Sequence, residues 1–268
     1  MADGMTGAYA GRLLIGAGAG FTWVGTLQLA ARWLPPNRFA MVTGLTLMLG
    51  MAGAIGGQAP LAAVVEFSGW RGTMAWAAGF ALLLAVLIWL IIRDHPPEDI
   101  NQEPPAADIE QESRSLLHGL RGTMANRQSW FVALYGGTLS ATMLSFAGLW
   151  GVPYLIQTYD ISRPEAATST SLLLVGWGIG GPLVGWLSDR LKRRKPLMVL
   201  GALVALATFS ALVYVPDLSL TSARIMLFLN GLFSGSMVLG FAAAREHNRP
   251  ETAGATLGFV NTFVMASG

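Results

Sequence analysis

The chain contains no cysteine, and only 12% of its 268 residues are charged. The absence of cysteine excludes disulfide bonds and leaves the redox compartment open. Soluble domains carry about 25% charged residues and need polar side chains to cover their surface. A net charge of +2 gives no reason to expect a nucleic-acid partner. The scarcity of charge therefore argues against an ordinary soluble protein of this length.

Histidine is also scarce, and His95, His118 and His247 all lie in polar connections between apolar segments. The sequence has no metal-ligand spacing and no strand-turn-helix nucleophile motif. We therefore expect no catalytic residue, no metal site and no cofactor. A membrane enzyme is a weaker alternative on these grounds.

The chain does contain long stretches without a single charge. About 20 apolar residues are enough to span a bilayer as a helix. Backbone groups in hydrocarbon must bond to one another, and the alternation typical of a transmembrane barrel is absent. The sequence predicts an all-α, polytopic membrane protein embedded in a lipid bilayer, with eight transmembrane segments, the last one truncated. The charge-free stretches are 13–31, 39–65, 72–92, 128–159, 166–188, 196–216, 225–244 and 252–268.

The connections between these stretches differ in charge. Alternate connections carry thirteen of the 17 Lys and Arg residues, whereas the others hold Arg71, Arg163 and Arg224. The positive-inside rule places the basic connections in the cytoplasm. We expect an integral protein of a bacterial inner membrane, whose first helix runs from outside to inside.

One connection is long and divides the chain. It begins with the proline-rich, acidic stretch RDHPPEDINQEPP and continues with IEQESRSLLHGLRGTM, which has the composition of a short amphipathic surface helix. Three predicted spans precede it and five follow. The predicted organisation is the end of an N-terminal half-bundle (1–92), a cytoplasmic central loop (93–127) and an incomplete C-terminal half-bundle (128–268).

The densest charge cluster lies in GWLSDRLKRRKP, residues 185–196. It resembles the signature loop of the major facilitator superfamily, Gly-x-x-x-Asp-Arg-x-Gly-Arg-Arg/Lys, with Lys192 in place of the second glycine. The stretch 11–20, which includes Arg12, is similar to the family's fourth-helix motif without its glutamine, and residues 69–71 match the lead into its sixth helix. The resemblance implies helices four to eleven of twelve, with helices missing at both ends.

Asp189 needs a partner on physical grounds. It lies at the C-terminus of a predicted helix, where the helix dipole disfavours an anion. Candidate cations are Arg190, Arg193 and Arg194. The resemblance implies another partner, the start of the helix after residues 35–38, across the interface between the halves. Gly185, Asp189 and these three arginines are therefore the predicted conformational latch, which would stabilise the outward-facing state.

Polar groups within the predicted spans are candidates for function. Arg12 would tune a proton-binding group or hold an anionic substrate, or else extend to the outer interface. The other candidates would line a substrate cavity, or else join helices or form an aromatic belt. Pro153 predicts a break or kink in its helix. The candidate cavity residues are Gln58, Tyr135, Trp150, Tyr154, Asn230 and Asn261.

The resemblance implies secondary transport of a small solute by alternating access, coupled to protons or another ion. A channel is an alternative, but no ring of charges or filter-like loop is present. A non-transporting membrane protein is another. Symport, antiport and uniport stay open, and the scarcity of buried charge argues against a highly charged substrate. Two glycine-rich stretches, 50–57 and 176–185, are expected to allow close helix packing.

Overall fold

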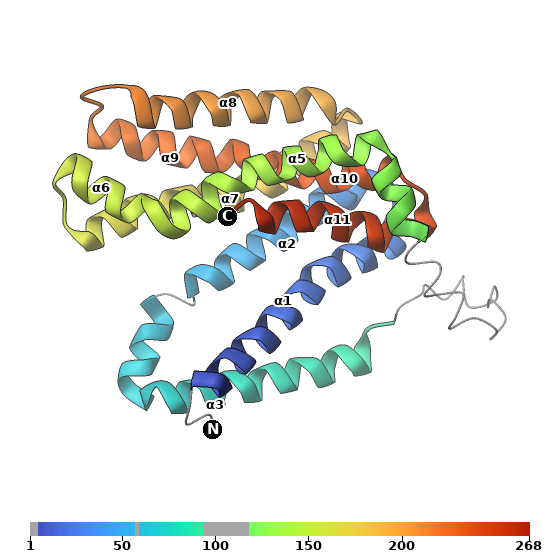
Figure 1. Cartoon of the computed structure of the whole chain (residues 1–268), viewed down its shortest axis with the longest axis horizontal. Helices are drawn as coiled ribbons and strands as arrows, with labels where there is room; N and C mark the ends of the chain where they lie inside the picture. The colour runs from blue at the N-terminus through green and yellow to red at the C-terminus, as the bar shows by residue number, and fades with distance from the viewer. Residues whose placement is uncertain (1–4, 57–58, 94–117) are drawn as a thin grey trace.

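The computed structural model describes residues 5–56, 59–93 and 118–268, and these residues are helical almost throughout (Figure 1). No strand occurs among them, which confirms the all-α prediction. Residues 118–125 form a stretch of helix within the predicted central loop. The named elements are α1 (Met5–Trp33), α2 (Pro36–Gly56), α3 (Ala59–Ile91), α5 (Arg127–Ala141), the π-helix η2 (Thr142–Trp150), α6 (Gly151–Tyr159), α7 (Arg163–Leu191), α8 (Lys195–Tyr214), α9 (Leu220–Ser234), the 3₁₀ turn η3 (Gly235–Met237), α10 (Val238–Glu246), the 3₁₀ turn η4 (Pro250–Thr252) and α11 (Ala253–Ala266).

Several of these helices are long enough to cross a membrane. Six stretches of the described residues combine at least 18 residues with high mean hydropathy, whereas α11 is shorter. The number of eight spans stays a prediction. The six stretches are Tyr9–Trp33, Phe67–Ile91, Arg127–Tyr159, Arg163–Leu191, Lys195–Tyr214 and Leu220–Glu246.

The second apolar stretch does not form the single helix that its lack of charge predicted. Helix α2 ends at Gly56, and α3 begins at Ala59 with Pro60 in its first turn. Glycine is a poor helix former, and proline favours the start of a helix because it has no N–H to leave unbonded. Residues 59–65 therefore belong to α3, which also bends sharply at Gly69 (φ 72°, ψ 158°).

Local capping fixes the turns of the C-terminal helices. The Ser162 hydroxyl accepts a hydrogen bond from the Glu165 N–H (3.4 Å) at the start of α7. The Ser219 hydroxyl accepts one from the Ser222 N–H (3.2 Å) at the start of α9. Such caps satisfy amide groups that the helix itself leaves free. They define where α7 and α9 begin, and therefore which of their residues face each other.

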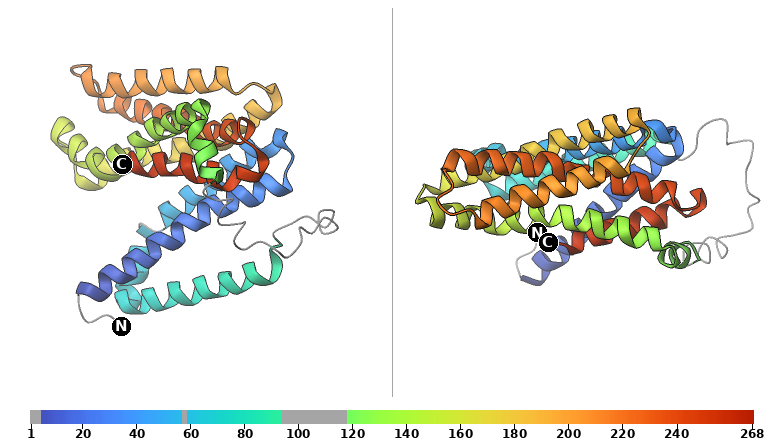
Figure 2. Two further views of the ribbon diagram at one scale, coloured as in Figure 1. Left: turned by 45° about the vertical axis from the view of Figure 1, so that its right-hand side comes forward. Right: turned by 90° about the horizontal axis from the view of Figure 1, so that it is seen from above.

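Helix α7 occupies the middle of the molecule. It packs against α2 on one side and against α9 on another, and α8 packs against α9 (Figures 1 and 2). Helix α11 packs against α5 and also contacts α1. We call α1–α3 the N-terminal group and α5–α11 the C-terminal group. The two groups therefore meet mainly along the α2–α7 contact and, to a smaller extent, along α1–α11.

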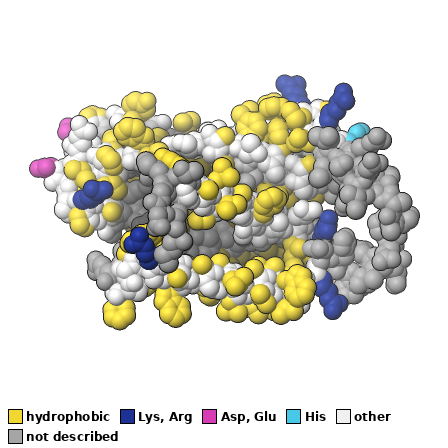
Figure 3. All heavy atoms as spheres, turned by 60° about the horizontal axis from the view of Figure 1, so that its bottom comes forward, with side chains coloured by type: hydrophobic (Ala, Val, Ile, Leu, Met, Phe, Trp, Pro, Cys, Tyr) yellow, Lys and Arg dark blue, Asp and Glu magenta, His cyan; other side chains and the backbone are white. Residues whose placement is uncertain are grey.

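The outer surface is strongly apolar. Phe21, Trp76 and Trp89 expose 81%, 76% and 81% of their surface. On the face drawn in Figure 3, hydrophobic side chains cover the middle, and lysine and arginine lie toward the two ends. A surface of this kind suits lipid around the middle and water at the ends.

Candidate functional site

The α2–α7 contact depends on small residues. Gly181 and Gly185 of α7 face Ala40 and Gly44 of α2, so that each helix contributes a small-xxx-small pair. A Cβ atom on Gly185 would collide with the Ala40 carbonyl and lie 3.0 Å from the Met41 Cα atom. The two backbones can approach this closely only because α7 has no side chain at that point. Gly185, singled out in the sequence, thus brings the end of α7 against the start of α2.

Asp189 lies one turn beyond this close approach, and its carboxylate is buried. Its Oδ2 atom accepts a hydrogen bond from the Met41 N–H of α2 (2.9 Å). Its Oδ1 atom accepts one from Arg194 Nη1 (2.5 Å). Arg194 also donates from Nε and Nη2 to Glu246 Oε1, at 3.0 and 2.8 Å. One chain of bonds therefore joins α2, the end of α7, the start of α8 and the end of α10.

This arrangement keeps Arg194 in its charged form. Burial lowers the pKa of its guanidinium, but the hydrogen bonds to Glu246 and Asp189 outweigh this effect, so that the pKa is raised above its usual value. The arginine therefore acts as a permanent positive charge throughout the physiological range.

The other two predicted latch arginines lie outside this network. Arg190 is exposed, and its guanidinium lies 5.4 Å from the centre of the Trp186 ring. Arg193 is exposed and contributes its carbonyl oxygen, which accepts a hydrogen bond from Ser188 Oγ (3.4 Å). The cause is the turn at Lys192, which takes a left-handed conformation (φ 52°) where the family pattern has glycine. Of the three candidate cations, only Arg194 forms an ion pair with Asp189 in the described structure.

A second contact joins the two groups at the same end of the molecule. Arg245 of α10 donates from Nη2 to the carbonyl oxygens of Ala31 and Leu34, where α1 ends. Its guanidinium also lies 4.8 Å from the centre of the buried Phe39 ring. A cation is favourable at a helix C-terminus, where carbonyl groups lack partners within the helix. Arg245 therefore adds a bond between α10 and α1 beside the Asp189 network.

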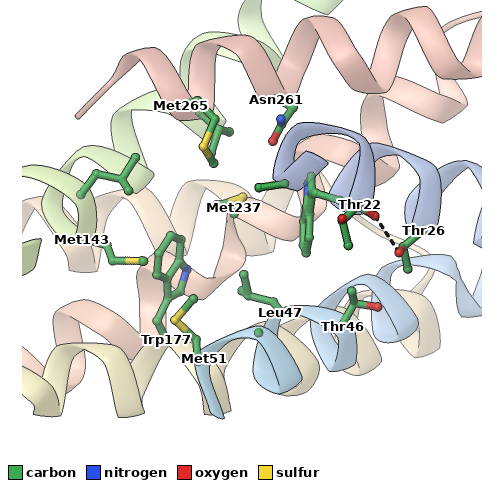
Figure 4. Close-up of a pocket in the computed structure, with 15 residues that line it drawn as sticks. Thr22, Thr26, Thr46, Leu47, Met51, Met143, Trp177, Met237, Asn261 and Met265 are labelled. Carbon is green, nitrogen blue, oxygen red and sulfur yellow. Dashed lines mark hydrogen bonds between the residues drawn. The ribbon is translucent and has the colours of Figure 1, made fainter. Parts of the chain in front are cut away.

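A cavity of about 540 Å³ opens between the two groups of helices (Figure 4). This volume is within the usual range for small-molecule sites. Its walls are mainly apolar, and none of the described residues that line it is charged. The lining residues are Ala19, Thr22, Trp23 and Thr26 of α1; Thr46, Leu47, Gly50 and Met51 of α2; and Met143, Leu144, Trp177, Met237, Asn261, Val264 and Met265 of the C-terminal group.

The cavity wall includes two places where the α-helical backbone is interrupted. Met143 and Leu144 belong to the π-helix η2, and Met237 belongs to the 3₁₀ turn η3. Such interruptions leave backbone groups without their usual helical partners, and they are frequent at functional sites in membrane transport proteins. The break predicted from Pro153 has a counterpart in η2, which ends at Trp150, three residues before Pro153.

Among the predicted cavity residues that the structure describes, only Asn261 lies at the cavity wall. The Tyr135 hydroxyl bonds to Ser236 Oγ (2.7 Å), and the Tyr154 hydroxyl donates to the Leu212 carbonyl (2.8 Å). Asn230 Nδ2 donates to the Ala205 carbonyl of α8 (2.9 Å). Trp150 is 67% exposed on the outside of the bundle. Tyr135, Tyr154 and Asn230 thus bond to neighbouring helices, and Trp150 is exposed.

Two candidates lie outside the described structure in whole or in part. Gln58 is outside the described residues. Position 12 lies in α1, but the Arg12 side chain is outside the described part. Residues 12, 19 and 23 are spaced seven and four positions apart, which places them on one face of a helix.

The apolar exterior, the closely packed helices and the uncharged internal cavity define a multi-pass integral membrane protein with a site between two helix groups. The sequence matches the Major Facilitator Superfamily over residues 3–268, and the chain belongs to this family. Its membership confirms the resemblance found in the 185–196 stretch.

Named relatives are similar over about three quarters of the chain. It is 28% identical over 223 residues to "Probable hexose phosphate transport protein" of Chlamydia muridarum, covering 74% of this chain and 48% of that protein. It is 27% identical to "Membrane sensor protein UhpC" of Salmonella typhimurium, over 76% of this chain and 49% of the sensor. It is also 27% identical to "Gallate transporter" of Pseudomonas putida, over 74% and 49%. The chain thus spans about half the length of these relatives.

Sequence reasoning missed three residues that the structure places at the site. Glu246 and Arg245 stand together at the end of a charge-free stretch, and this isolated pair of opposite charges was the available signal. Trp177 is the one aromatic residue in the glycine-rich stretch 176–185. Its bulk between Gly176 and Gly178 indicated a position where a side chain fills space next to close backbone contacts.

Proposed function

We propose that the chain is part of a secondary transporter, which carries a small solute across the membrane by alternating access. The observation that carries this proposal is the position of the cavity. It lies between the two helix groups, while breakable polar contacts join the same groups at one end. Separation of these contacts would open the cavity to the basic end without unfolding either group. The transporter names of two relatives support the same function.

The end that carries the Asp189 network is also the basic end of the molecule. Arg32 lies in the last turn of α1, and Arg38 and Arg127 lie at the starts of α2 and α5. These helix ends are on the same side of the molecule as the turn between α7 and α8. The positive-inside rule assigns this end to the cytoplasm of a bacterial inner membrane. The contacts between the groups at this end thus support an arrangement closed toward the cytoplasm, and Asp189 would stabilise the outward-facing state.

Coupling to protons or another ion is part of the proposal, and Arg12 is its candidate residue. A cation at position 12 would attract an anionic substrate or lower the proton affinity of a nearby group. Neutralising Arg12 with glutamine should therefore reduce pH-driven uptake while leaving the Asp189 network intact.

The first experiment tests the latch. The absence of native cysteine allows a single reporter, Thr46→Cys, at the cavity wall on α2. Asp189→Asn removes the charge that pairs with Arg194, at an expected cost of about 2 kcal/mol to the closed arrangement. Labelling by an impermeant maleimide from the basic side should rise about 30-fold, because that free energy shifts the population toward the open form.

The matched control is Arg190→Gln, which removes a neighbouring charge outside the network. Its labelling rate should stay within about twofold of the parent, because surface charges contribute little. Equal labelling of the Asp189→Asn variant and the parent would contradict the role of Asp189 in stabilising the closed arrangement. Saturable uptake and counterflow in proteoliposomes under an imposed pH gradient then test transport itself, whereas ohmic current would indicate a channel.

A second candidate function is solute sensing without transport. The observation that favours it is the similarity to the membrane sensor protein UhpC, at the same level of identity as to the gallate transporter. A sensor would bind its ligand in the cavity and change the maleimide labelling of Thr46→Cys without counterflow. A transporter would show both responses.

A further inference from the structure

The cavity contains two buried polar atoms that have no partner. Among the described residues, five buried side-chain nitrogen or oxygen atoms lack a hydrogen bond, and two of these are Trp177 Nε1 and Asn261 Oδ1. Both residues line the cavity, and Figure 4 shows the indole of Trp177 and the amide of Asn261 on facing sides of it. Trp177 is only 2% exposed. A buried polar group normally has a partner, so that these two atoms indicate where a ligand would bond.

The two atoms have opposite hydrogen-bonding roles. The indole N–H of Trp177 can only donate, and the amide oxygen of Asn261 accepts. A ligand that satisfies both therefore has an acceptor at the end facing Trp177 and a donor at the end facing Asn261. The threonine hydroxyls nearby are already used as donors, since Thr22, Thr26 and Thr46 each bond to a carbonyl one turn earlier in their own helix.

The remainder of the wall is suited to a flat apolar body. Met51, Met143, Met237 and Met265 present thioether side chains, which make favourable contacts with aromatic rings. The ring of Trp23 adds an aromatic surface from α1, where it packs edge-on against Phe241 at 5.7 Å. Methionine side chains can change rotamer to contact a ring, and the Trp23 ring can pack against it. A set of fixed polar groups would not provide such contacts.

The same wall is poorly suited to a sugar phosphate. A hexose phosphate carries a doubly charged group and several hydroxyls, each of which would lose its bonds to water in the cavity. The described lining offers no cation and only two unpartnered polar atoms. The desolvation of such a ligand would therefore not be compensated by these walls.

We infer that this cavity binds a single-ring aromatic compound, with its ring between the methionines, its acceptor group on Trp177 Nε1 and a ring hydroxyl on Asn261 Oδ1. The inference rests on the proposed function, because it names the substrate class of the same site. Of the two transported compounds in the names of the relatives, gallate contains such a ring and a hexose phosphate does not.

The test uses 4-hydroxybenzamide, a neutral ring with a carbonyl opposite a hydroxyl, and benzamide, which lacks the hydroxyl. Binding to the chain in lipid nanodiscs is measured by isothermal titration calorimetry. We expect 4-hydroxybenzamide to bind about fivefold more tightly than benzamide, because it makes one more hydrogen bond. Asn261→Leu should abolish this difference, and Trp177→Phe should weaken both ligands about fivefold and leave the difference intact.

The controls are Thr262→Ala, on an exposed position beside Asn261, and Trp186→Phe, an exposed tryptophan of the same helix as Trp177. Both variants should bind like the parent. Glucose 6-phosphate binding as tightly as 4-hydroxybenzamide, or an absence of saturable binding by 4-hydroxybenzamide, would overturn the inference.

The same preparation separates this inference from the proposed function. Selective binding of 4-hydroxybenzamide without counterflow in proteoliposomes would leave the ligand class standing and contradict transport. Tight binding and counterflow of glucose 6-phosphate would support transport and contradict the ligand class.

Discussion

Helix α7 uses glycine to pack against two neighbours, and the two contacts differ in what surrounds them. Toward α9, Gly176 and Gly180 face the backbones of Phe228 and Leu232, within the C-terminal group. Toward α2, Gly181 and Gly185 face the N-terminal group. The α2 contact is continuous with the polar network at one end and with the cavity wall further along. The α9 contact therefore lies within one group, whereas the α2 contact joins the two groups and adds bonds that can be broken and remade.

The largest effect is expected on the α9 side. A Cβ atom on Gly180 would collide with the Leu232 backbone carbonyl, and backbone within one packed group has nowhere to move. Gly180→Ala should cost at least about 3 kcal/mol and lower the unfolding midpoint by about 6–12 °C. Thermal unfolding in detergent, followed by tryptophan fluorescence, measures this change.

The control for that variant is Gly258→Ala in α11, where an added Cβ atom meets nothing within 4 Å. Alanine is the better helix former, so this variant should unfold at the same temperature or slightly above it. A midpoint for Gly180→Ala equal to that of Gly258→Ala would contradict the distinction between the two faces of α7.

A smaller loss of stability is expected on the α2 side. A Cβ atom on Gly185 also collides with backbone, at Ala40, but α2 can separate from α7 in the open form. Gly185→Ala should therefore lower the unfolding midpoint by less than Gly180→Ala and raise labelling of Thr46→Cys from the basic side. A large fall in the midpoint with unchanged labelling would show that the α2 contact is as permanent as the α9 contact.

The smallest effect concerns the turn after α7. Lys192 has a positive φ, which is strained for a residue with a Cβ atom. Lys192→Gly should stabilise the chain by about 1 kcal/mol, or about 2–4 °C in the unfolding midpoint. Lys192→Ala removes the same charge but keeps the Cβ atom, and it should give no such gain. Equal stabilisation by both variants would attribute the effect to charge and not to the backbone.

Much of the fold could be predicted because lipid imposes a simple rule on sequence. A stretch of about 20 residues without charge forms a helix wherever the bilayer must be crossed, and the six long apolar stretches follow this rule. The rule fails at the 39–65 stretch because a lack of charged residues does not show where one helix ends and the next begins. Its division depends on glycine and on Pro60, and the bend at Gly69 depends on one backbone angle.

The candidate site was less predictable, because it depends on which residues of distant segments meet. The position of Asp189 near α2 followed from the family pattern and the helix dipole. The choice of Arg194 over Arg190 depends on the left-handed turn at Lys192, which the sequence does not determine. Tyr135 and Asn230 have the chemistry of ligand contacts, but they bond to neighbouring helices. Polarity identifies a residue that needs a partner without identifying which partner it finds.

The π-helix η2 gives the span between Arg127 and Tyr159 a mechanical property. A π turn contains one residue more than an α turn, so that conversion of a π turn to an α turn changes the angular position of every residue beyond it. Helix α6 would then rotate about its own axis relative to α5 while the backbone of both stays hydrogen-bonded. Movement of the cavity-lining side chains of Met143 and Leu144 would thus be transmitted as torsion toward the far end of the span, without a hinge of exposed loop residues.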